Sequence, residues 1–476
     1  MKDTIKHTYL AADFGGGSGR IIAGFLCHGK LELEEVYRFS NRQVKLGNHI
    51  YWDFPALFED MKTGLKLAAQ KGYAVESIGI DTWGVNFGLI DKHGNLLGNP
   101  VCYRDARTEG IPEEVFKLLD ERQHYADTGI QVMSINTLFQ LHSMKQHQDT
   151  QLEVARQLLF MPDLFSYFLT GVANNEYCIA STSELLDARS RNWSLDTIRT
   201  LGLPEHLFGE IILPGTIRGT LKEDIARETG LGTVDIIAVG SHDTASAVAA
   251  VPAVESPIAF LSSGTWSLLG VEVDEPILTE EARKVQFTSE GGVDGKIRFL
   301  QNITGLWILQ RLMSEWKACG EEQNYDIIIP QAAEAQIATI IPVDDATFMN
   351  PENMENALIH YCRHHALQVP KNKAEIVRCV LQSLAFKYRQ AVEQLNRCLP
   401  SSIRQLNIIG GGSQNQLLNQ LTADELGIPV YAGPVEATAM GNILTQAMAK
   451  GEIADLRELR EIVTRSVTPQ VYYPKK

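Results

Sequence analysis

The feature that most constrains the fold is the glycine-rich segment "ADFGGGSGR" at residues 12–20. A P-loop requires G-x-x-x-x-G-K-[ST], and this segment has no lysine. A dinucleotide fingerprint requires G-x-G-x-x-G, but the third position after Gly15 and Gly17 is Arg20. Both motifs also lead directly into a helix, whereas the following "RIIAGFLCHGKLELEEVYRF" has a strand pattern. We therefore predict strand, glycine turn, strand, turn, strand, with the glycine turn joining two antiparallel strands.

Two interpretations of this turn stay open on local grounds. Its backbone N–H groups, together with Ser18, can surround an anion without a helix. A hairpin without a ligand is the alternative, because hairpin turns favour glycine on conformational grounds. Asp13 stands at the exit of the apolar strand, where a turn requires no acid. A carboxylate there suits Mg²⁺ held through water beside phosphates.

The same pattern recurs near the middle of the chain in "PIAFLSSGTWSLLGVEV". We predict a strand at 258–261, a polar turn at 262–265 and a second strand at 266–273. Each half of the chain then begins with a strand–turn–strand unit, which predicts a duplicated architecture. Two such turns facing each other would hold a polyphosphate from both sides of a cleft.

The segment "TVDIIAVGSHDTASAVAAVPAVES" joins the two halves. It predicts a buried strand at 234–239, a polar turn and an alanine-rich helix ending near Pro252. Asp243 lies at the end of the strand and the start of the helix. Ser241 or Asp243 could simply cap the helix. A carboxylate at a strand end beside an interdomain cleft is also well placed as a general base, and the two interpretations are compatible.

A third glycine element is "LNIIGGGSQNQLLNQLTADELGIPV". We predict a strand at 406–409, a turn at 410–412 and a helix at 414–426 with Ser413 as a plausible cap. Backbone N–H groups at the start of that helix can meet an anion or a nucleotide. Tight helix packing is the alternative explanation for the small residues that follow.

Composition excludes several classes of function. The 476 residues suggest two domains of roughly 200–250 residues each. A formal net charge of −15 disfavours nucleic acid or an anionic membrane as the main partner. We expect no signal peptide and no membrane span. The seven scattered cysteines predict reduced thiols in the cytoplasm, and that compartment argues against a bridge between Cys362 and Cys379.

Together, several motifs resemble the FGGY carbohydrate kinases of the sugar kinase–actin–chaperone superfamily. They are "DFGGGSGR", "GIDTWGVNFGLID", "YRDART", "GSHDTASAVAAVP", "LSSGTWSLLGVE", "NITGLWILQR" and "IIGGGSQNQLLNQLTADELGIPV". The resemblance covers nearly the whole chain. It implies an α/β fold of two RNase H-like domains with an interdomain active-site cleft. It also implies an N-terminal kinase domain at 1–245, with the sugar site and phosphate loop, and a nucleotide-binding C-terminal domain at 246–476.

The resemblance further implies roles for individual residues. Asp243 matches the catalytic base, and Asp13 matches a residue that helps to hold Mg²⁺, through water. Matches to sugar-binding positions are Gly84, His242, Asp243, Thr244 and Asn302, and matches to ATP-binding positions are Gly16, Gly17, Ser18, Gly19, Arg20, Thr265, Gln310 and Gly411.

Within the family, the motifs favour the branch that uses ATP to phosphorylate L-rhamnulose at O1 in L-rhamnose catabolism. The alternatives are another ketose, such as L-fuculose or L-xylulose, or a non-catalytic nucleotide switch related to actin and chaperones. The chain departs from the pattern at Asn86, where an aspartate beside the sugar is usual, and in the first loop, which has Gly-Gly-Ser for Ala-Ser-Ser. Whether the chain is a monomer or a dimer stays open.

Overall fold

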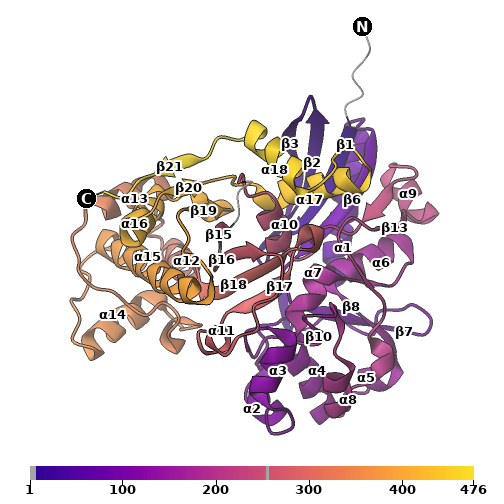
Figure 1. Cartoon of the computed structure of the whole chain (residues 1–476), viewed down its shortest axis with the longest axis horizontal. Helices are drawn as coiled ribbons and strands as arrows, with labels where there is room; N and C mark the ends of the chain where they lie inside the picture. Colours follow the sequence, from indigo (N-terminus) through magenta and orange to yellow (C-terminus); the bar gives the residue numbers. More distant parts are fainter. Residues whose placement is uncertain (1–6, 254–256, 476) are drawn as a thin grey trace. The chain divides into compact units, whose positions relative to one another are not determined.

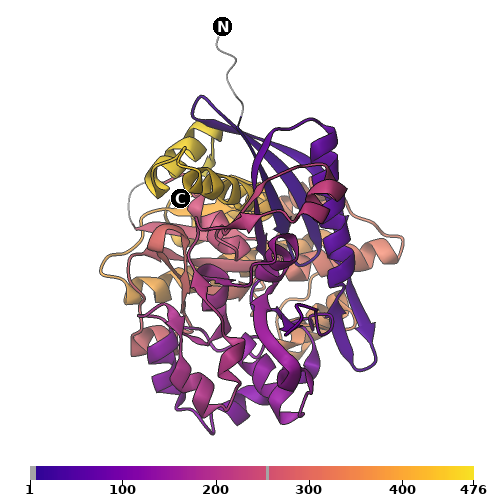
Figure 2. The same ribbon diagram turned by 90° about the vertical axis from the view of Figure 1, so that its right-hand side faces the viewer.

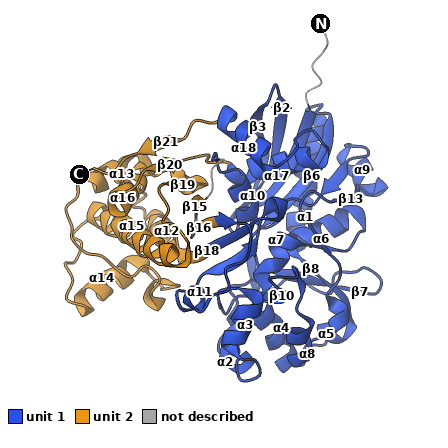
Figure 3. Cartoon of the chain, viewed as in Figure 1, with its two compact units in different colours: residues 1–254, 272–299, 437–466 blue, residues 255–271, 300–436, 467–476 orange. Residues whose placement is uncertain are grey.

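The chain packs into two compact units in the computed structural model, which describes residues 7–253 and 257–475 (Figure 3). The first unit comprises the described residues of 1–254, 272–299 and 437–466, and the second those of 255–271, 300–436 and 467–476. The division into domains at 1–245 and 246–476 follows the order of the motifs and stays a prediction. The first unit differs from it by including two later segments of the chain.

The main sheet of the first unit has the strand order β13-β14-β6-β1-β2-β3 (Figure 1). Its strands are β1 (His7–Phe14), β2 (Ser18–Cys27), β3 (Lys30–Ser40), β6 (Val75–Thr82), β13 (Ile217–Thr220) and β14 (Asp235–Ile237). Strands β1, β2 and β3 pair antiparallel in sequence, whereas β6 runs parallel to both β1 and β14. The predicted strand–turn–strand–turn–strand is therefore confirmed, and no helix follows the glycine turn.

Helices cover both faces of this sheet. On one face α1 (Phe54–Gln70) comes so close that a Cβ on Gly64 would lie 2.2 Å from Ile21 of β2. On the other face α17 (Ala437–Ala449) comes equally close, because a Cβ on Gly24 would lie 2.6 Å from Ile443. Residues 21 and 24 of one strand point to opposite faces. Figure 2 shows the long helix α1 beside the N-terminal strands.

The first unit also holds a second apolar core, which includes Phe139, Leu158 and Ile179. Its further helices are α2 (Ile111–Val115), α3 (Glu121–Thr128), α4 (Thr137–Gln146), α5 (Gln151–Val154), α6 (Met161–Thr170), α7 (Tyr177–Ala180), α8 (Leu195–Thr200), α9 (Glu223–Thr229), α10 (Asp243–Ala249), α11 (Glu280–Lys284) and α18 (Leu456–Ser466). Its further strands are β4 (Gln43–Leu46), β5 (His49–Trp52), β7 (Phe87–Asp91), β8 (Ala155–Phe160), β9 (Asn175–Glu176), β10 (Leu186–Asp187), β11 (Asn192–Trp193), β12 (Ile211–Ile212) and β17 (Thr288–Gly291).

The second unit holds the strand order β18-β16-β15-β19-β20-β21. These strands are β18 (Ile297–Thr304), β16 (Trp266–Val273), β15 (Ile258–Ser263), β19 (Leu406–Ile409), β20 (Val430–Ala432) and β21 (Gln470–Tyr472), of which residues 297–299 and 272–273 belong to the first unit. Its helices are α12 (Trp307–Ala318), α13 (Tyr325–Glu334), α14 (Met354–His364), α15 (Lys373–Cys398) and α16 (Gln416–Leu426). The predicted second strand–turn–strand unit is confirmed as β15 and β16.

The helix after the third glycine turn begins two residues later than predicted. A short 3₁₀ turn over Gly411–Gln414 intervenes, and Asn415 caps α16 by accepting a hydrogen bond from the backbone N–H of Leu418 at 3.0 Å. The prediction of Ser413 as the cap is wrong, because its hydroxyl instead donates to the carbonyl oxygen of Gly410 at 2.7 Å.

The seven cysteines all lie among the described residues and form no disulfide with one another, and Cys362 and Cys379 are both buried. Among the described residues, no helix is both long and apolar enough to cross a membrane.

Gly17 and Gly19 of the first turn should differ in their response to substitution by alanine. A Cβ on Gly19 would lie 2.3 Å from two ring carbons of Phe39, whereas a Cβ on Gly17 would meet no atom within 4 Å. Neither residue has a positive φ. We expect Gly19→Ala to lower the free energy of unfolding by about 1–3 kcal/mol through overpacking.

The control, Gly17→Ala, should change the free energy of unfolding by less than about 0.5 kcal/mol. Chemical denaturation of both variants measures the difference. Equal stability of the two variants would contradict the packing assigned to Gly19.

Candidate active site

Three strand ends of the first unit meet at one edge of its sheet. Asp13 near the end of β1 pairs in register with Asp81 near the end of β6. The backbone N–H of Thr82 donates to the carbonyl oxygen of Ser241 at 2.9 Å, just beyond β14. Because these strands run parallel, their carboxyl ends share one edge, which is where ligands bind in α/β sheets. The glycine turn and Asp243 therefore lie in one place.

The glycine turn itself is a tight hairpin. The backbone N–H of Gly15 donates to the carbonyl oxygen of Ser18 at 2.9 Å, and the Asn41 side chain donates to the carbonyl oxygen of Gly15 at 2.8 Å. Gly16 and Gly17 are exposed, without positive φ angles. Backbone conformation therefore does not explain why both positions are glycine.

The space above the turn is open. A Cβ on Gly17 would contact nothing, and one on Gly16 would approach only the hydroxyl of Tyr103, at 3.9 Å. Gly19 differs, since Phe39 excludes any side chain there. Gly16 and Gly17 thus leave room for a group such as a phosphate to reach the backbone, while Gly19 serves packing.

Two carboxylates of this edge differ in their partners. Asp13 is buried and accepts a 2.6 Å hydrogen bond from the Arg20 guanidinium. Asp81 is completely buried; its Oδ2 accepts from the Asn442 amide at 2.5 Å, and its Oδ1 has no hydrogen-bond partner. Burial, followed by the charges of Asp13 and Asp243, raises the pKa of Asp81 well above its ordinary value, although Asn442 and Arg20 oppose the shift.

The residues of this edge fit a hydrated magnesium ion. Among the described residues, no three histidine, cysteine, aspartate or glutamate side chains converge as a complete set of metal ligands. Mg²⁺ usually keeps several waters and binds one or two carboxylates together with substrate phosphates. Asp13 and the unpartnered oxygen of Asp81, next to the open turn, supply that kind of donor set.

Asp243 lies in the first turn of α10. The N-cap of this helix is His242, and no side chain caps it, so the capping interpretation of Ser241 and Asp243 is wrong. The Asp243 carboxylate accepts from the Thr244 hydroxyl at 3.1 Å and keeps 32% of its side-chain exposure. Burial raises its pKa, and the charge of Asp13 adds to this effect, whereas His242 and Thr244 oppose it.

The structure brings four of the five predicted sugar residues together. A Cβ on Gly84 would lie 3.5 Å from Nε2 of His242, and that nitrogen lies 3.5 Å from Oδ1 of Asp243, next to Thr244. Asn302 lies on β18, in the part of that strand that belongs to the second unit.

Asn86 is completely buried behind this cluster. Its Oδ1 accepts hydrogen bonds from Nε1 of Trp52 at 2.7 Å, Nε1 of Trp83 at 3.0 Å and the backbone N–H of Tyr103 at 3.2 Å. Its amide nitrogen donates to the carbonyl oxygen of Val101 at 2.9 Å. Asn86 therefore orients two neighbouring indoles, whose planes are tilted by 37°, and Tyr103, rather than presenting an open polar group to a sugar.

Sequence reasoning missed Asp81, Asn442 and Tyr103. Asp81 ends an apolar strand, "SIGID", in the same way as Asp13, and that signal could have found it. Tyr103 stands within the quoted "YRDART", but no sequence signal shows that its hydroxyl lies nearest to Gly16.

The predicted nucleotide residues of the second unit also gather at strand ends. Thr265 follows β15, and its hydroxyl donates to the side-chain carbonyl of Gln310 on α12 at 3.0 Å. Gly411 follows β19, which runs parallel to β15. A Cβ on Gly411 would meet nothing within 4 Å, whereas one on Gly412 would collide with Ser263. Gly411 is thus the open position of this turn.

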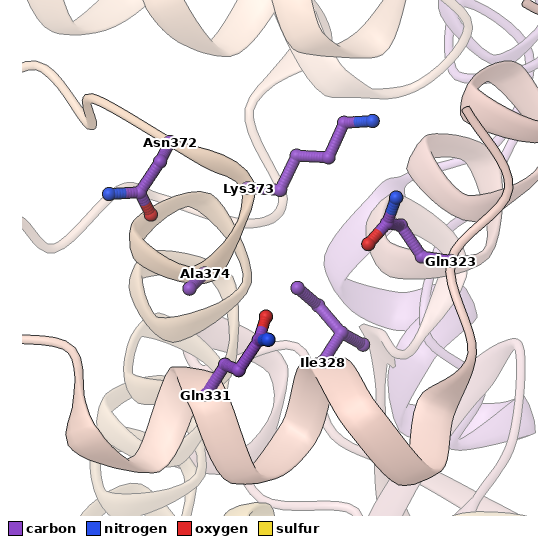
Figure 4. A pocket seen from close by; sticks show the side chains of 6 residues that line it. All are labelled: Gln323, Ile328, Gln331, Asn372, Lys373 and Ala374. Carbon is purple, nitrogen blue, oxygen red and sulfur yellow. The ribbon is translucent and has the colours of Figure 1, made fainter.

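A separate cavity of about 570 Å³ lies in the second unit, between α13 and the start of α15 (Figure 4). Its lining residues are Gln323, Ile328, Gln331, Asn372, Lys373 and Ala374. None of them is a predicted site residue, so this cavity is not the candidate site.

The chain matches two models of known families. The FGGY family of carbohydrate kinases, N-terminal domain, matches residues 8–250, and the C-terminal domain of the same family matches residues 259–450. A rhamnulokinase of Bacteroides thetaiotaomicron is 46% identical over 472 residues, covering 99% of this chain and 96% of its own. A rhamnulokinase of Oceanobacillus iheyensis is 40% identical over 463 residues, covering 97% of each chain.

Solved structures share the fold at low sequence identity. A ligand-bound xylulose kinase from Lactobacillus acidophilus superposes with a TM-score of 0.82 at 15% identity, covering 98% of this chain and 94% of its own. A Plasmodium falciparum glycerol kinase with ADP gives a TM-score of 0.79 at 14% identity, covering 99% and 94%. The predicted two-domain sugar kinase fold is confirmed, and the chain belongs to the FGGY family of carbohydrate kinases.

Proposed function

We propose that this chain transfers the γ-phosphate of ATP to O1 of L-rhamnulose, giving L-rhamnulose 1-phosphate and ADP, in the breakdown of L-rhamnose. The relatives named rhamnulokinase, 40–46% identical over nearly the full length, support this choice of sugar. One observation carries the proposal. Asp243 caps no helix, is partly exposed and lies at the same sheet edge as the open glycine turn.

Asp243 acts as the general base in this proposal. Phosphoryl transfer gives a protein little covalent work, so alignment and charge stabilisation dominate. The Asp243 carboxylate accepts the proton of the O1 hydroxyl as that oxygen attacks the γ-phosphorus. Gly84, His242 and Thr244 hold the ketose beside it, and Asn302 contributes from β18. The raised pKa of Asp243 suits a base that must take a proton near neutral pH.

The proposed nucleotide contacts come from two sets of residues. In the first unit, backbone N–H groups of Gly16 to Gly19, the Ser18 hydroxyl and Arg20 receive the phosphates. In the second unit, Thr265, Gln310 and Gly411 contact ATP at the ends of β15 and β19. Asp13, through water and assisted by Asp81, would hold Mg²⁺, which when bound would neutralise phosphate charge.

The proposed setting is the cytoplasm, where ATP is available and the scattered thiols stay reduced. The proposed partners are ATP and the sugar, without nucleic acid or membrane.

A coupled ADP-release assay over a panel of ketoses tests the proposal. We expect kcat/KM to be highest for L-rhamnulose, with L-fuculose and L-xylulose below it, and phosphorus NMR of the product to show a 1-phosphate. A preference for another ketose would overturn the choice of sugar but keep the kinase. ATP binding without sugar-dependent ADP release would instead indicate a nucleotide switch.

Replacing the proposed base should separate activity from stability. General-base assistance is worth about 10²–10⁴-fold, so we expect Asp243→Asn to lower kcat at least that far while ATP binding persists. Because the folded pKa of Asp243 is raised, its stability contribution is present at low pH and is lost as pH rises through that pKa. The variant should therefore be at least as stable as wild type at neutral pH, and relatively less stable in acid.

The measurements are steady-state kinetics and thermal unfolding across a pH series, in which wild-type kcat/KM should rise as Asp243 loses its proton. A variant with wild-type kcat would remove Asp243 from its proposed role.

Restoring the family's usual aspartate should damage this protein. In Asn86→Asp, an oxygen replaces the amide that donates to Val101, and a charge is buried. We expect a loss of about 2–4 kcal/mol at neutral pH. Since burial holds the folded pKa of such a carboxyl above its unfolded value, the loss should shrink as pH falls.

Asn48→Asp, in the exposed turn between β4 and β5, is the control and should be neutral. Denaturation and ketose kinetics check both variants. If Asn86→Asp kept wild-type stability and changed the preferred sugar, residue 86 would be a direct sugar contact after all.

A further inference from the structure

The imidazole of His242 connects the proposed sugar site to a buried ion pair. On its Nδ1 side lie Nη2 of Arg298, at 3.2 Å, and Oε2 of Glu290, at 3.3 Å. On its Nε2 side lie Oδ1 of Asp243, at 3.5 Å, and the open position of Gly84. The charged groups facing this ring thus come from α10, from β17 and from the part of β18 that belongs to the first unit.

Arg298 is held rigidly. Its side chain is completely buried, and its Nε donates to the carbonyl oxygen of Gly291 at 2.8 Å. Its Nη2 lies 3.1 Å from Oε2 of Glu290. Burial alone would raise the pKa of Glu290, but the positive charge of Arg298 is the strongest influence against burial, and that pKa lies below its ordinary value. Glu290 therefore stays ionised and anchors the guanidinium.

The contact with Arg298 fixes where the His242 proton resides. A guanidinium has only donors, so its hydrogen bond to Nδ1 requires a lone pair on that nitrogen. Oε2 of Glu290 lies close to the same nitrogen but has no hydrogen-bond partner. A neutral imidazole whose Nδ1 accepts a hydrogen bond carries its proton on Nε2.

We propose that Arg298, anchored by Glu290, is a positioning residue that keeps His242 neutral and protonated on Nε2, so that the ring presents a fixed donor to an oxygen of the ketose. This inference rests on the proposed function, in which His242 contacts the sugar. A ring in this state cannot take the proton of the attacking hydroxyl through Nε2, which leaves Asp243 as the acceptor. Donation to a sugar oxygen beside the reacting hydroxyl holds the substrate in line.

The proton position can be measured without any activity. The full chain, labelled with ¹⁵N-histidine, gives long-range ¹H–¹⁵N correlations that distinguish the two neutral tautomers and the imidazolium. The signals that disappear in His242→Gln assign the ring. We expect the Nε2–H tautomer near neutral pH. An Nδ1–H tautomer or an imidazolium would overturn the inference.

Arg298→Lys tests the consequence for the sugar. Lysine keeps the charge but loses the planar fork that reaches Gly291, Glu290 and His242 together. We expect KM for L-rhamnulose to rise about 5- to 20-fold, the effect of one misplaced hydrogen bond, with KM for ATP unchanged. The tautomer signals should also shift toward a mixture.

Arg460→Lys is the matched control. Arg460 is also buried and pairs with both oxygens of Glu272, at 2.8 and 2.7 Å, in the same unit without contacting a proposed site residue. The Arg460→Lys variant should lose about as much free energy of unfolding as Arg298→Lys but leave KM for the sugar unchanged. If both variants left that KM unchanged, the inference would fail. If the wild-type protein phosphorylated no ketose, the proposed function would fail instead. In that case, and also if Arg298→Lys did not fold, the NMR measurement of the His242 proton would decide the inference.

Discussion

Negative charge gathered at one edge of the first unit's sheet is the constraint on which the rest of the site depends. The parallel register of β1 and β6 sets Asp13 beside Asp81, and the end of β14 brings Asp243 to the same edge. The guanidinium of Arg20 pairs with the Asp13 carboxylate. Burial, together with repulsion from neighbouring aspartates, raises the pKa values of Asp81 and Asp243. Such an arrangement costs stability, and it is useful only where a cation and a phosphoryl group arrive together.

A buried polar chain supports that edge from behind. Asn442 on α17 donates to Asp81, Gln446 donates to the side-chain oxygen of Asn442 at 2.7 Å, and Ser77 on β6 donates to Gln446 at 2.7 Å. All these groups are completely buried, so each hydrogen bond replaces one that water would otherwise make. A Cβ on Gly79 would lie 2.4 Å from the Asn442 oxygen, which explains why β6 carries a glycine there.

The sequence predicted local geometry well and long-range partners poorly. Periodicity and glycine patterns predicted β1, β2, β15 and β16, and the resemblance supplied the family and candidate residues such as Asp243 and Thr265. The predicted cap at Ser413 failed because an intervening 3₁₀ turn shifted the helix start, and hydroxyl hydrogen bonds to nearby carbonyls compete with capping. Glu290 and Arg298 carried no signal, because their importance comes only from tertiary contact with His242.

The membership of α17 and α18 in the first unit has a consequence for how the protein is made. Synthesis proceeds from the N-terminus, and residues 8–250 leave the ribosome long before residues 437–466. Until then one face of the N-terminal sheet lacks α17, and Asp81 lacks the amide of Asn442. The first unit therefore cannot finish folding until residues 437–466 have left the ribosome. Until then one apolar face of its sheet stays exposed, and transiently exposed apolar surface of this kind is prone to aggregation.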